Sequence, residues 1–410
     1  MTDPRQIPSP PTLALALPVA LLGQTFTAAM MFAPSVLAPA ASVDIGVPAS
    51  AVGLMTALIY LAAAFAAPQI GARVPQVGAV RVTQIGLVIS GCGLALCAVA
   101  HPWVVLLAAI VIGIGYGPST PSGSALLVEY TPPRMFNFVM SIRQTGVTMG
   151  GALAGFAVPW LILVAGWRAG VVIAGAACLL VALILQTVRA RFDYRVHAER
   201  AATGGTVARA SWIDSLRMVL AHRALRRLSL TAFLYGGVQL TYSSFMVVFM
   251  VEQAGMNMVR AGVVLSSGML AGMIGRLAWG ALADALGDSR KVLIGLGTVT
   301  TACAALCTQI TAQWPYASIL VLAVVFGACT FGWNGVYIAE LARAAPPGKV
   351  AHATGASLSF AYGGAVVVPP LFALVQMLSG SYLVPFIMAA LFAAAGVLSL
   401  MRLHKSKTIK

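Results

Sequence analysis

Two arginines, Arg143 and Arg276, stand inside long apolar stretches of this sequence, where charged residues are otherwise rare. A guanidinium stays charged and presents fixed, forked donors that match a carboxylate or a similar oxyanion. If these stretches cross a bilayer, an ionisable residue within them is costly and usually serves a substrate or ion pathway. The two arginines therefore predict binding of a small organic anion.

The spacing of both arginines from polar residues places them deep in the predicted bilayer. Arg143 lies nine residues after Arg134, which corresponds to about 13 Å along a helix. Arg276 lies eight residues before Asp284, which corresponds to about 12 Å. Both depths are close to the middle of a hydrocarbon core about 30 Å thick.

Other polar side chains within the apolar stretches are candidates to bind the same substrate. They are Gln24, Tyr60, Tyr116 and Gln144 in the first half of the chain, and Tyr235, Gln239, Tyr242, Asn334, Tyr337 and Tyr362 in the second. Each could instead make a hydrogen bond between two helices, which is worth less than about 2 kcal/mol. Both interpretations stay open for each residue.

The elements that carry these residues are predicted to be membrane-spanning helices. The chain is 60% hydrophobic and only 9% charged, whereas soluble proteins contain about 25% charged residues. Twelve apolar stretches have the length of roughly 20 residues that a helical crossing needs. They are 13–38, 49–70, 80–100, 103–127, 136–163, 168–189, 226–252, 258–282, 290–310, 315–340, 351–377 and 382–402. The predicted fold is therefore an all-α membrane protein with twelve transmembrane helices.

The distribution of basic residues supports this count. All but four of the 25 Lys and Arg residues fall on one side of the membrane when twelve crossings are assumed. Only Arg168 and Arg260 fall on the other side, and the remaining two are Arg143 and Arg276. Because cytoplasmic loops carry the excess of basic residues, both termini are predicted to be cytoplasmic. The net charge of +15 is thus explained without nucleic acid.

One long polar segment divides the chain. Residues 190–225 are rich in arginine and are predicted to form a cytoplasmic linker between two six-helix bundles, at 1–189 and 226–410. The end of the linker, from Ser211 to His222, has the pattern of an amphipathic helix on the membrane surface.

The two halves contain a repeated loop pattern after their second predicted helices. Gly71, Gly78 and Arg81 recur 209 residues later as Gly280, Gly287 and Arg290. The second copy has an acid at Asp284, whereas the first copy has Pro75 at the corresponding position. Duplicated six-helix units of parallel topology are an architecture of secondary transporters.

The second copy, Gly-x-Leu-Ala-Asp-x-x-Gly-x-x-Arg, resembles the signature of the major facilitator superfamily. The resemblance implies two pseudo-symmetric six-helix bundles that alternate between inward-open and outward-open states. It also implies that the loop latches a cytoplasmic gate, a role better supported for Asp284 than for the first loop. Helices 5 and 8 meet in this family, which implies that Arg143 and Arg276 face a central cavity.

Shorter segments resemble particular branches of the superfamily. Residues 141–146 and 332–337 look like bacterial members near the cyanate and nitroimidazole transport branch. Residues 275–280 look like helix 8 of monocarboxylate transporters, in which an arginine contacts the substrate carboxylate. These resemblances imply a secondary transporter of a small organic anion, with a monocarboxylate as one candidate, in a bacterial inner membrane.

The acids lie at the ends of the predicted spans or outside them, and none is near the middle of a span. Glu129 and Glu340 are at cytoplasmic ends, where they are expected to act as gate latches, with Arg143 or Arg134 as partners. Because no mid-span acid is present to carry a proton, symport, antiport and uniport all stay open. Protons remain one candidate for the coupling ion.

Two other functions were weighed. A multidrug exporter of the same superfamily is an open alternative. In such antiporters the helix 5 motif ends in Gly-Pro. That pair is absent here, since Pro159 follows Gly151 by eight residues. A membrane-embedded enzyme or a receptor is disfavoured, because the five histidines lie at span ends or in loops and no Asp pair lies in a span. We therefore expect no catalytic residue, metal site or cofactor. We also expect the protein to be a monomer whose partners are lipid and the substrate.

Overall fold

The computed structural model describes residues 12–46, 52–202 and 212–402, and the regular elements within them are all helices. Eleven of these described helices are long and apolar enough to cross a membrane. The centre of the predicted linker, with Gly204, Gly205 and Arg209, lies outside the described residues, as do the basic residues Arg5 and Lys405 near the chain ends.

The first half of the chain forms the first six predicted spans. Its helices are α1 (Leu13–Ile45), α2 (Val52–Gly71), α3 (Val74–Val77), α4 (Ala79–Leu96), α5 (Pro102–Tyr116), α6 (Ser119–Tyr130) and α7 (Phe136–Ala202). The fourth predicted span is divided between α5 and α6, because Pro118 lacks the N–H that a continuous helix requires. Helix α1 ends beyond its predicted edge at 38, since a polar helix end can extend out of the hydrocarbon into water.

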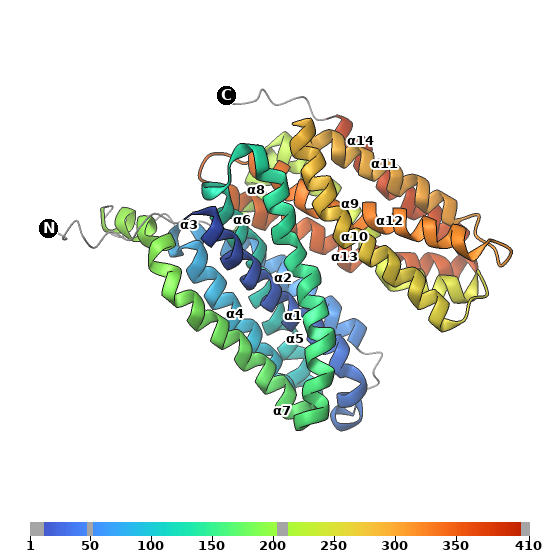
Figure 1. The fold of residues 1–410 in the computed structure, drawn as a ribbon, viewed down its shortest axis with the longest axis horizontal. Helices are drawn as coiled ribbons and strands as arrows, with labels where there is room; N and C mark the ends of the chain where they lie inside the picture. The colour runs from blue at the N-terminus through green and yellow to red at the C-terminus, as the bar shows by residue number, and fades with distance from the viewer. Residues whose placement is uncertain (1–11, 47–51, 203–211, 403–410) are drawn as a thin grey trace. The chain divides into compact units, whose positions relative to one another are not determined.

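Helix α7 is 67 residues long and accounts for two crossings. A straight helix of this length would measure about 100 Å, roughly three times the hydrocarbon thickness. Gly166 interrupts it with φ 78° and ψ 160°, a backbone conformation that glycine adopts readily. Figure 1 shows the two arms of α7 meeting at a sharp bend. With this bend, the predicted twelve crossings are confirmed.

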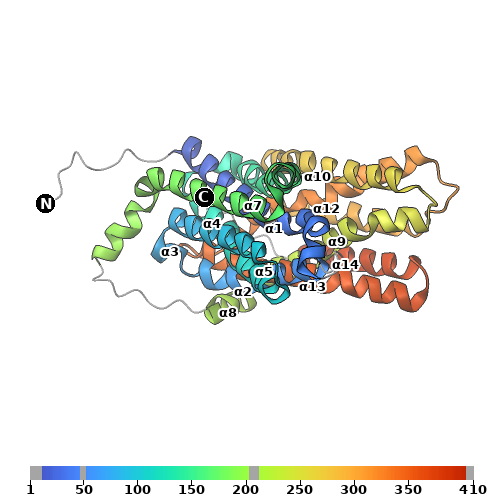
Figure 2. The same cartoon turned by 90° about the horizontal axis from the view of Figure 1, so that it is seen from below.

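The second half forms the remaining six spans. Its helices are α8 (Trp212–Ala221), α9 (Arg223–Glu252), α10 (Met258–Leu286), α11 (Ser289–Cys307), α12 (Tyr316–Ala344), α13 (Val350–Ser379) and α14 (Leu383–Met401). Helices α10 and α12 lie side by side in both views (Figures 1 and 2). Their backbones approach closely at Gly268 and Gly327, where a Cβ on Gly327 would lie 2.1 Å from the Gly268 carbonyl oxygen.

The described residues group into two compact units that follow the two halves of the sequence, with two segments exchanged. Arg134–Ile142, at the start of α7, groups with the helices of the second half. Pro346–Ser359, at the start of α13, groups with those of the first half. The boundaries 1–189, 190–225 and 226–410 therefore stay a prediction, as does the membrane-surface position of α8.

Candidate substrate and gating sites

Arg143 lies in a polar cluster of the first unit, formed by α1, α6 and α7. Its side chain is 0% exposed. Nη1 donates to Gln24 Oε1 at 3.0 Å, and Nη2 donates to Gln144 Oε1 at 2.6 Å. Gln24 Oε1 also accepts hydrogen bonds from the hydroxyls of Ser119 at 2.9 Å and Thr120 at 3.3 Å. Amide oxygens orient a guanidinium without neutralising its charge.

Two glycines make room for this cluster. A Cβ on Gly123 of α6 would lie 3.0 Å from Arg143 Nη1, and a Cβ on Gly146 of α7 would lie 3.0 Å from Gln24 Cβ. Sequence reasoning found Arg143, Gln24 and Gln144 but missed Ser119 and Thr120. The available signal was the polar run at 119–124, which interrupts an apolar span.

Arg276 lies in a second polar cluster, formed by α9, α10 and α12 within the second unit. Its side chain is 3% exposed, and its Nε donates to the carbonyl oxygen of Phe331 at 2.9 Å. Asn334 Nδ2 donates to the same carbonyl at 3.2 Å and to Gln239 Oε1 at 3.0 Å. The indole N–H of Trp333 donates to Gln239 Oε1 at 3.0 Å. We call Gln239, Asn334 and Trp333 the amide cluster.

Two predicted tyrosines use their hydroxyls to join helices. Tyr235 donates to the carbonyl oxygen of Leu293 on α11 at 3.2 Å, and Tyr242 donates to that of Ala323 on α12 at 3.1 Å. These bonds match the interhelical alternative that the sequence left open.

The other predicted aromatic residues are divided between the two units. Tyr337 is buried, and its ring lies edge-on to that of Trp333 with centroids 5.1 Å apart, which places it beside the amide cluster. Tyr362 is buried on α13. In the first unit Tyr116 is buried on α5, and Tyr60 is half-buried on α2, the helix that packs against α5.

Asp284, at the predicted cytoplasmic end of α10, caps the start of α7. Its Oδ1 accepts hydrogen bonds from Asn137 N at 3.0 Å and from Asn137 Nδ2 at 2.7 Å. Its Oδ2 accepts from Phe138 N at 2.8 Å. Because α7 begins at Phe136, these are first-turn N–H groups that a helix cannot satisfy itself, and the helix dipole favours a carboxylate there.

Residues of α11 and α12 surround this cap. Ser289 donates to Asn137 Oδ1 at 2.8 Å, and Arg343 donates to the Ser289 hydroxyl. Glu340 forms its ion pair with Arg343 at 3.8 Å, where the sequence had suggested Arg143 or Arg134. Sequence reasoning missed Asn137, Ser289 and Arg343, because nothing in their spacing indicates that they meet Asp284.

The remaining gating candidates lie at other helix ends. Gly280 permits close approach of Ser141, since a Cβ there would lie 2.4 Å from the serine hydroxyl oxygen. Gly287 ends α10 with φ 61°. Arg290 donates to the carbonyl oxygens of Leu400 at 2.8 Å and Met401 at 2.7 Å. Glu129 is exposed near the end of α6.

The first repeat of the loop is built differently from the second. A Cβ on Gly71 would lie 2.7 Å from the carbonyl oxygen of Ala351. The end of α2 and the start of α13 therefore pack closely through small residues. Near Gly78, the buried carboxylate of Asp193 accepts from Val80 N at 3.3 Å and Arg81 N at 3.1 Å. Asp193, which sequence reasoning missed, thus caps α4 from the far arm of α7.

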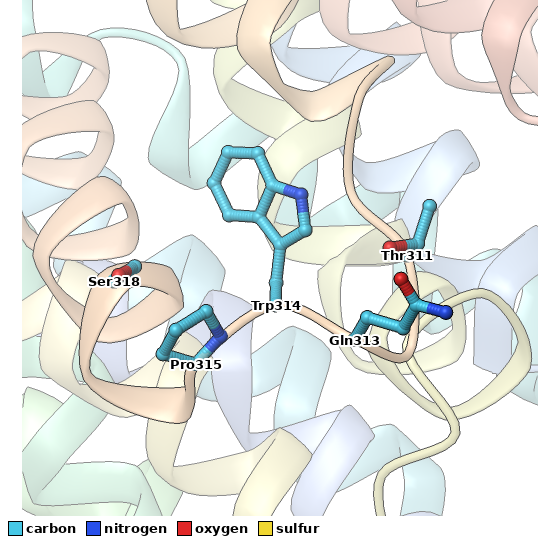
Figure 3. Close-up of a pocket in the computed structure, with 5 residues that line it drawn as sticks. All are labelled: Thr311, Gln313, Trp314, Pro315 and Ser318. Atoms are coloured by element: carbon cyan, nitrogen blue, oxygen red, sulfur yellow. The ribbon is translucent and has the colours of Figure 1, made fainter.

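A separate open hollow of about 440 Å³ lies at the loop between α11 and α12, on the predicted external side (Figure 3). It is lined by Thr311, Gln313, Trp314, Pro315 and Ser318. None of these is a predicted substrate residue. At the same predicted side, Tyr382 donates to Glu252 Oε2 at 2.7 Å. Burial, and then the hydrogen bond to this carboxylate, raises the pKa of Tyr382.

The sequence of residues 20–369 matches the family model described as the Major Facilitator Superfamily. The chain belongs to the major facilitator superfamily. Membership agrees with the twelve crossings, the duplicated loop and the buried arginines described above. The chain is therefore a multi-pass membrane protein of a family of transporters, whose members are not enzymes.

Curated superfamily relatives carry names of aromatic-acid transporters. A gallate transporter of Pseudomonas putida is 25% identical over 63% of this chain and 63% of its own length. A 4-hydroxybenzoate transporter, PcaK, of the same organism is 31% identical over 39% of this chain and 35% of its own. A benzoate transport protein of Acinetobacter baylyi is 22% identical over 70% of this chain and 66% of its own. This chain thus spans less than two thirds of the length of each.

A solved structure supports the superfamily fold. The chain is similar to FucP, a major facilitator superfamily transporter described in the outward conformation, with a TM-score of 0.72 and 18% identity. The match covers 94% of this chain and 98% of FucP. At this level of identity the similarity concerns the fold alone.

Proposed function

We propose that this chain is a secondary transporter of aromatic carboxylates in a bacterial inner membrane, working by alternating access. The observation that carries the proposal is that several matching relatives are named for aromatic acids, among them gallate, 4-hydroxybenzoate and benzoate. This proposal keeps the predicted small organic anion. It replaces the cyanate, nitroimidazole and monocarboxylate branches that the short sequence resemblances suggested.

Arg276 is the proposed ligand of the substrate carboxylate. Its Nε is bonded to the Phe331 carbonyl, which fixes the plane of the guanidinium. In that orientation a carboxylate would bind end-on through Nη1 and Nη2, in the bidentate geometry that arginine favours. Arg143, oriented by Gln24 and Gln144, is the corresponding candidate for anion binding within the first unit, taken by itself.

The transport test uses the full chain in proteoliposomes with radiolabelled benzoate and 4-hydroxybenzoate, with and without an imposed pH gradient. Wild-type protein should show saturable uptake. Arg276→Lys should raise the half-saturation concentration roughly tenfold or more, because a lysine cannot form the bidentate pair and a charge-assisted bond is worth about 1.5–3 kcal/mol.

The matched control is Arg260→Lys, at the predicted external end of α10, where the guanidinium lies 5.5 Å from the Tyr316 ring. It should leave uptake close to that of wild type. Uptake of hydrophobic cations without any uptake of aromatic acids would reject the proposal in favour of a multidrug exporter.

A further inference from the structure

The amide cluster on α9 and α12 has an orientation that its hydrogen bonds determine. The indole N–H of Trp333 can only donate, so the Gln239 atom that lies 3.0 Å from it must be the oxygen. Asn334 meets the same oxygen at 3.0 Å and must therefore present its NH₂ group. Trp333 thus fixes which way both amides point.

This orientation leaves one donor and one acceptor on neighbouring side chains. Both N–H bonds of Asn334 Nδ2 are used, one on Gln239 Oε1 and one on the Phe331 carbonyl. In the part of the chain that the structure describes, Gln239 Nε2 and Asn334 Oδ1 make no hydrogen bond. The pair can therefore still donate through Gln239 Nε2 and accept through Asn334 Oδ1.

The position of Gln239 and Asn334 indicates that this amide pair faces water or substrate. Gln239 and Asn334 are half-buried, whereas Trp333 is 2% exposed and Tyr337 is 1% exposed. Both amides lie well inside α9 and α12, at depths where polar groups face the bundle interior or an aqueous cavity and avoid lipid. Facing lipid, the unused donor and acceptor would each carry the cost of a missing hydrogen bond.

We propose that Gln239 and Asn334 bind a hydroxyl group on the aromatic ring of the substrate and so determine its specificity. A hydroxyl both accepts and donates, which matches Gln239 Nε2 and Asn334 Oδ1 in turn. A second carboxylate would be repelled by Asn334 Oδ1. This inference rests on the proposed transport of aromatic carboxylates.

The amide pair lies next to the proposed carboxylate ligand. Arg276 Nε and Asn334 Nδ2 donate to the same oxygen, that of Phe331, at 2.9 and 3.2 Å. The guanidinium and the amide pair are therefore neighbours within one unit, so a small ring could present its carboxylate to one and its hydroxyl to the other. The ring of Trp333, which packs edge-on against that of Tyr337, lies beside the pair, since its N–H donates to Gln239.

The test measures dissociation constants of the purified full chain by calorimetry for benzoate, 3-hydroxybenzoate and 4-hydroxybenzoate. Wild-type protein should bind at least one hydroxylated acid about tenfold more tightly than benzoate, because the pair forms two hydrogen bonds that benzoate cannot make. In Asn334→Ala this ratio should fall to about one, while the constant for benzoate changes by less than about threefold.

Two further variants keep the test decisive. Trp333→Phe removes the N–H that orients Gln239, together with part of the buried indole ring, and it should reduce the ratio to an intermediate value. Ser243→Ala, one turn along α9, removes a hydroxyl that bonds to its own helix, and it should leave the ratio unchanged. Reversible unfolding raises the apparent dissociation constants of all three acids by the same factor, so a partly unfolded variant still reports the ratio.

The outcomes separate the two proposals. If wild-type protein binds benzoate as tightly as both hydroxylated acids, or if Asn334→Ala keeps the wild-type ratio, the hydroxyl inference is rejected while aromatic-acid transport stands. If none of the three acids binds or is transported, the proposed function itself is rejected.

Discussion

At the residue scale, Asp193 and Gly78 depend on each other. The Asp193 carboxylate accepts hydrogen bonds from Val80 N and Arg81 N, and it does so across the space that a side chain at residue 78 would fill. A Cβ on Gly78 would lie 2.3 Å from Asp193 Cγ, and the residue has φ 96°. Glycine is therefore required here for two reasons, its missing side chain and its backbone conformation.

Gly78→Ala should destabilise the protein by about 1 kcal/mol or more, because alanine meets both the steric and the conformational penalty. The measurement is the unfolding temperature of the purified protein in detergent. Gly295→Ala is the matched control, since Gly295 lies inside α11 with open space around its Cβ position. It should be neutral or stabilising by up to about 1 kcal/mol. Equal effects of the two substitutions would contradict this account.

At the element scale, the N-termini of several helices in this chain are capped by carboxylates. Some of these carboxylates belong to another helix, and one belongs to the residue that directly precedes its own helix. Asp284 of α10 caps α7, and Asp193 of α7 caps α4, whereas Asp288 caps its own helix, α11, by accepting from Lys291 N. A cap that comes from another helix holds two helices together in addition to satisfying N–H groups. Such a contact is suited to a gate, since it can break when the helices separate.

Asp284→Asn should lower the unfolding temperature more than Asp288→Asn. The first substitution removes a carboxylate that is 9% exposed and accepts three hydrogen bonds, at a cost of about 1–2 kcal/mol. The second affects a more exposed carboxylate with a single capping bond, and about 0.5 kcal/mol is expected. A larger effect of Asp288→Asn would show that Asp284 does not act as the stronger cap.

At the scale of the whole molecule, the exchange of Arg134–Ile142 and Pro346–Ser359 shows that the compact units are not simply the two sequence halves. Each exchanged segment is the start of a long helix. Arg134–Ile142 contains the residues that Asp284 caps, and Pro346–Ser359 contains Ala351, which closely approaches Gly71. The two loops of the repeated pattern therefore contact the two exchanged segments, one through a carboxylate and one through small residues.

The orientation of the whole chain in the membrane is a prediction that insertion of epitopes can test. An epitope placed in the linker at 203–211 should be accessible only from the cytoplasmic side, because residues 189–227 around it hold nine of the 25 Lys and Arg residues. One placed at Gly255, between α9 and α10, should be accessible from the outside. Labelling intact and permeabilised cells distinguishes the sides, and an epitope in the linker that is labelled in intact cells would reverse the orientation.

The sequence by itself determined the spans, the repeated loop and the two arginines within the membrane. These follow from hydropathy, length and charge, which act over short stretches of chain. Asp284 and its loop were recognisable for the same reason, because the pattern is contiguous.

Only the tertiary structure decided which polar residues meet. Tyr235, Gln239 and Tyr242 share one helical stripe, yet the tyrosines bond to backbone carbonyls of other helices while Gln239 joins Trp333 and Asn334. Ser119 joins Gln24, and Asp193 caps α4, across 95 and at least 112 residues of chain. Such pairs depend on the rotation and approach of helices that are distant in sequence, and no local pattern of residues encodes these.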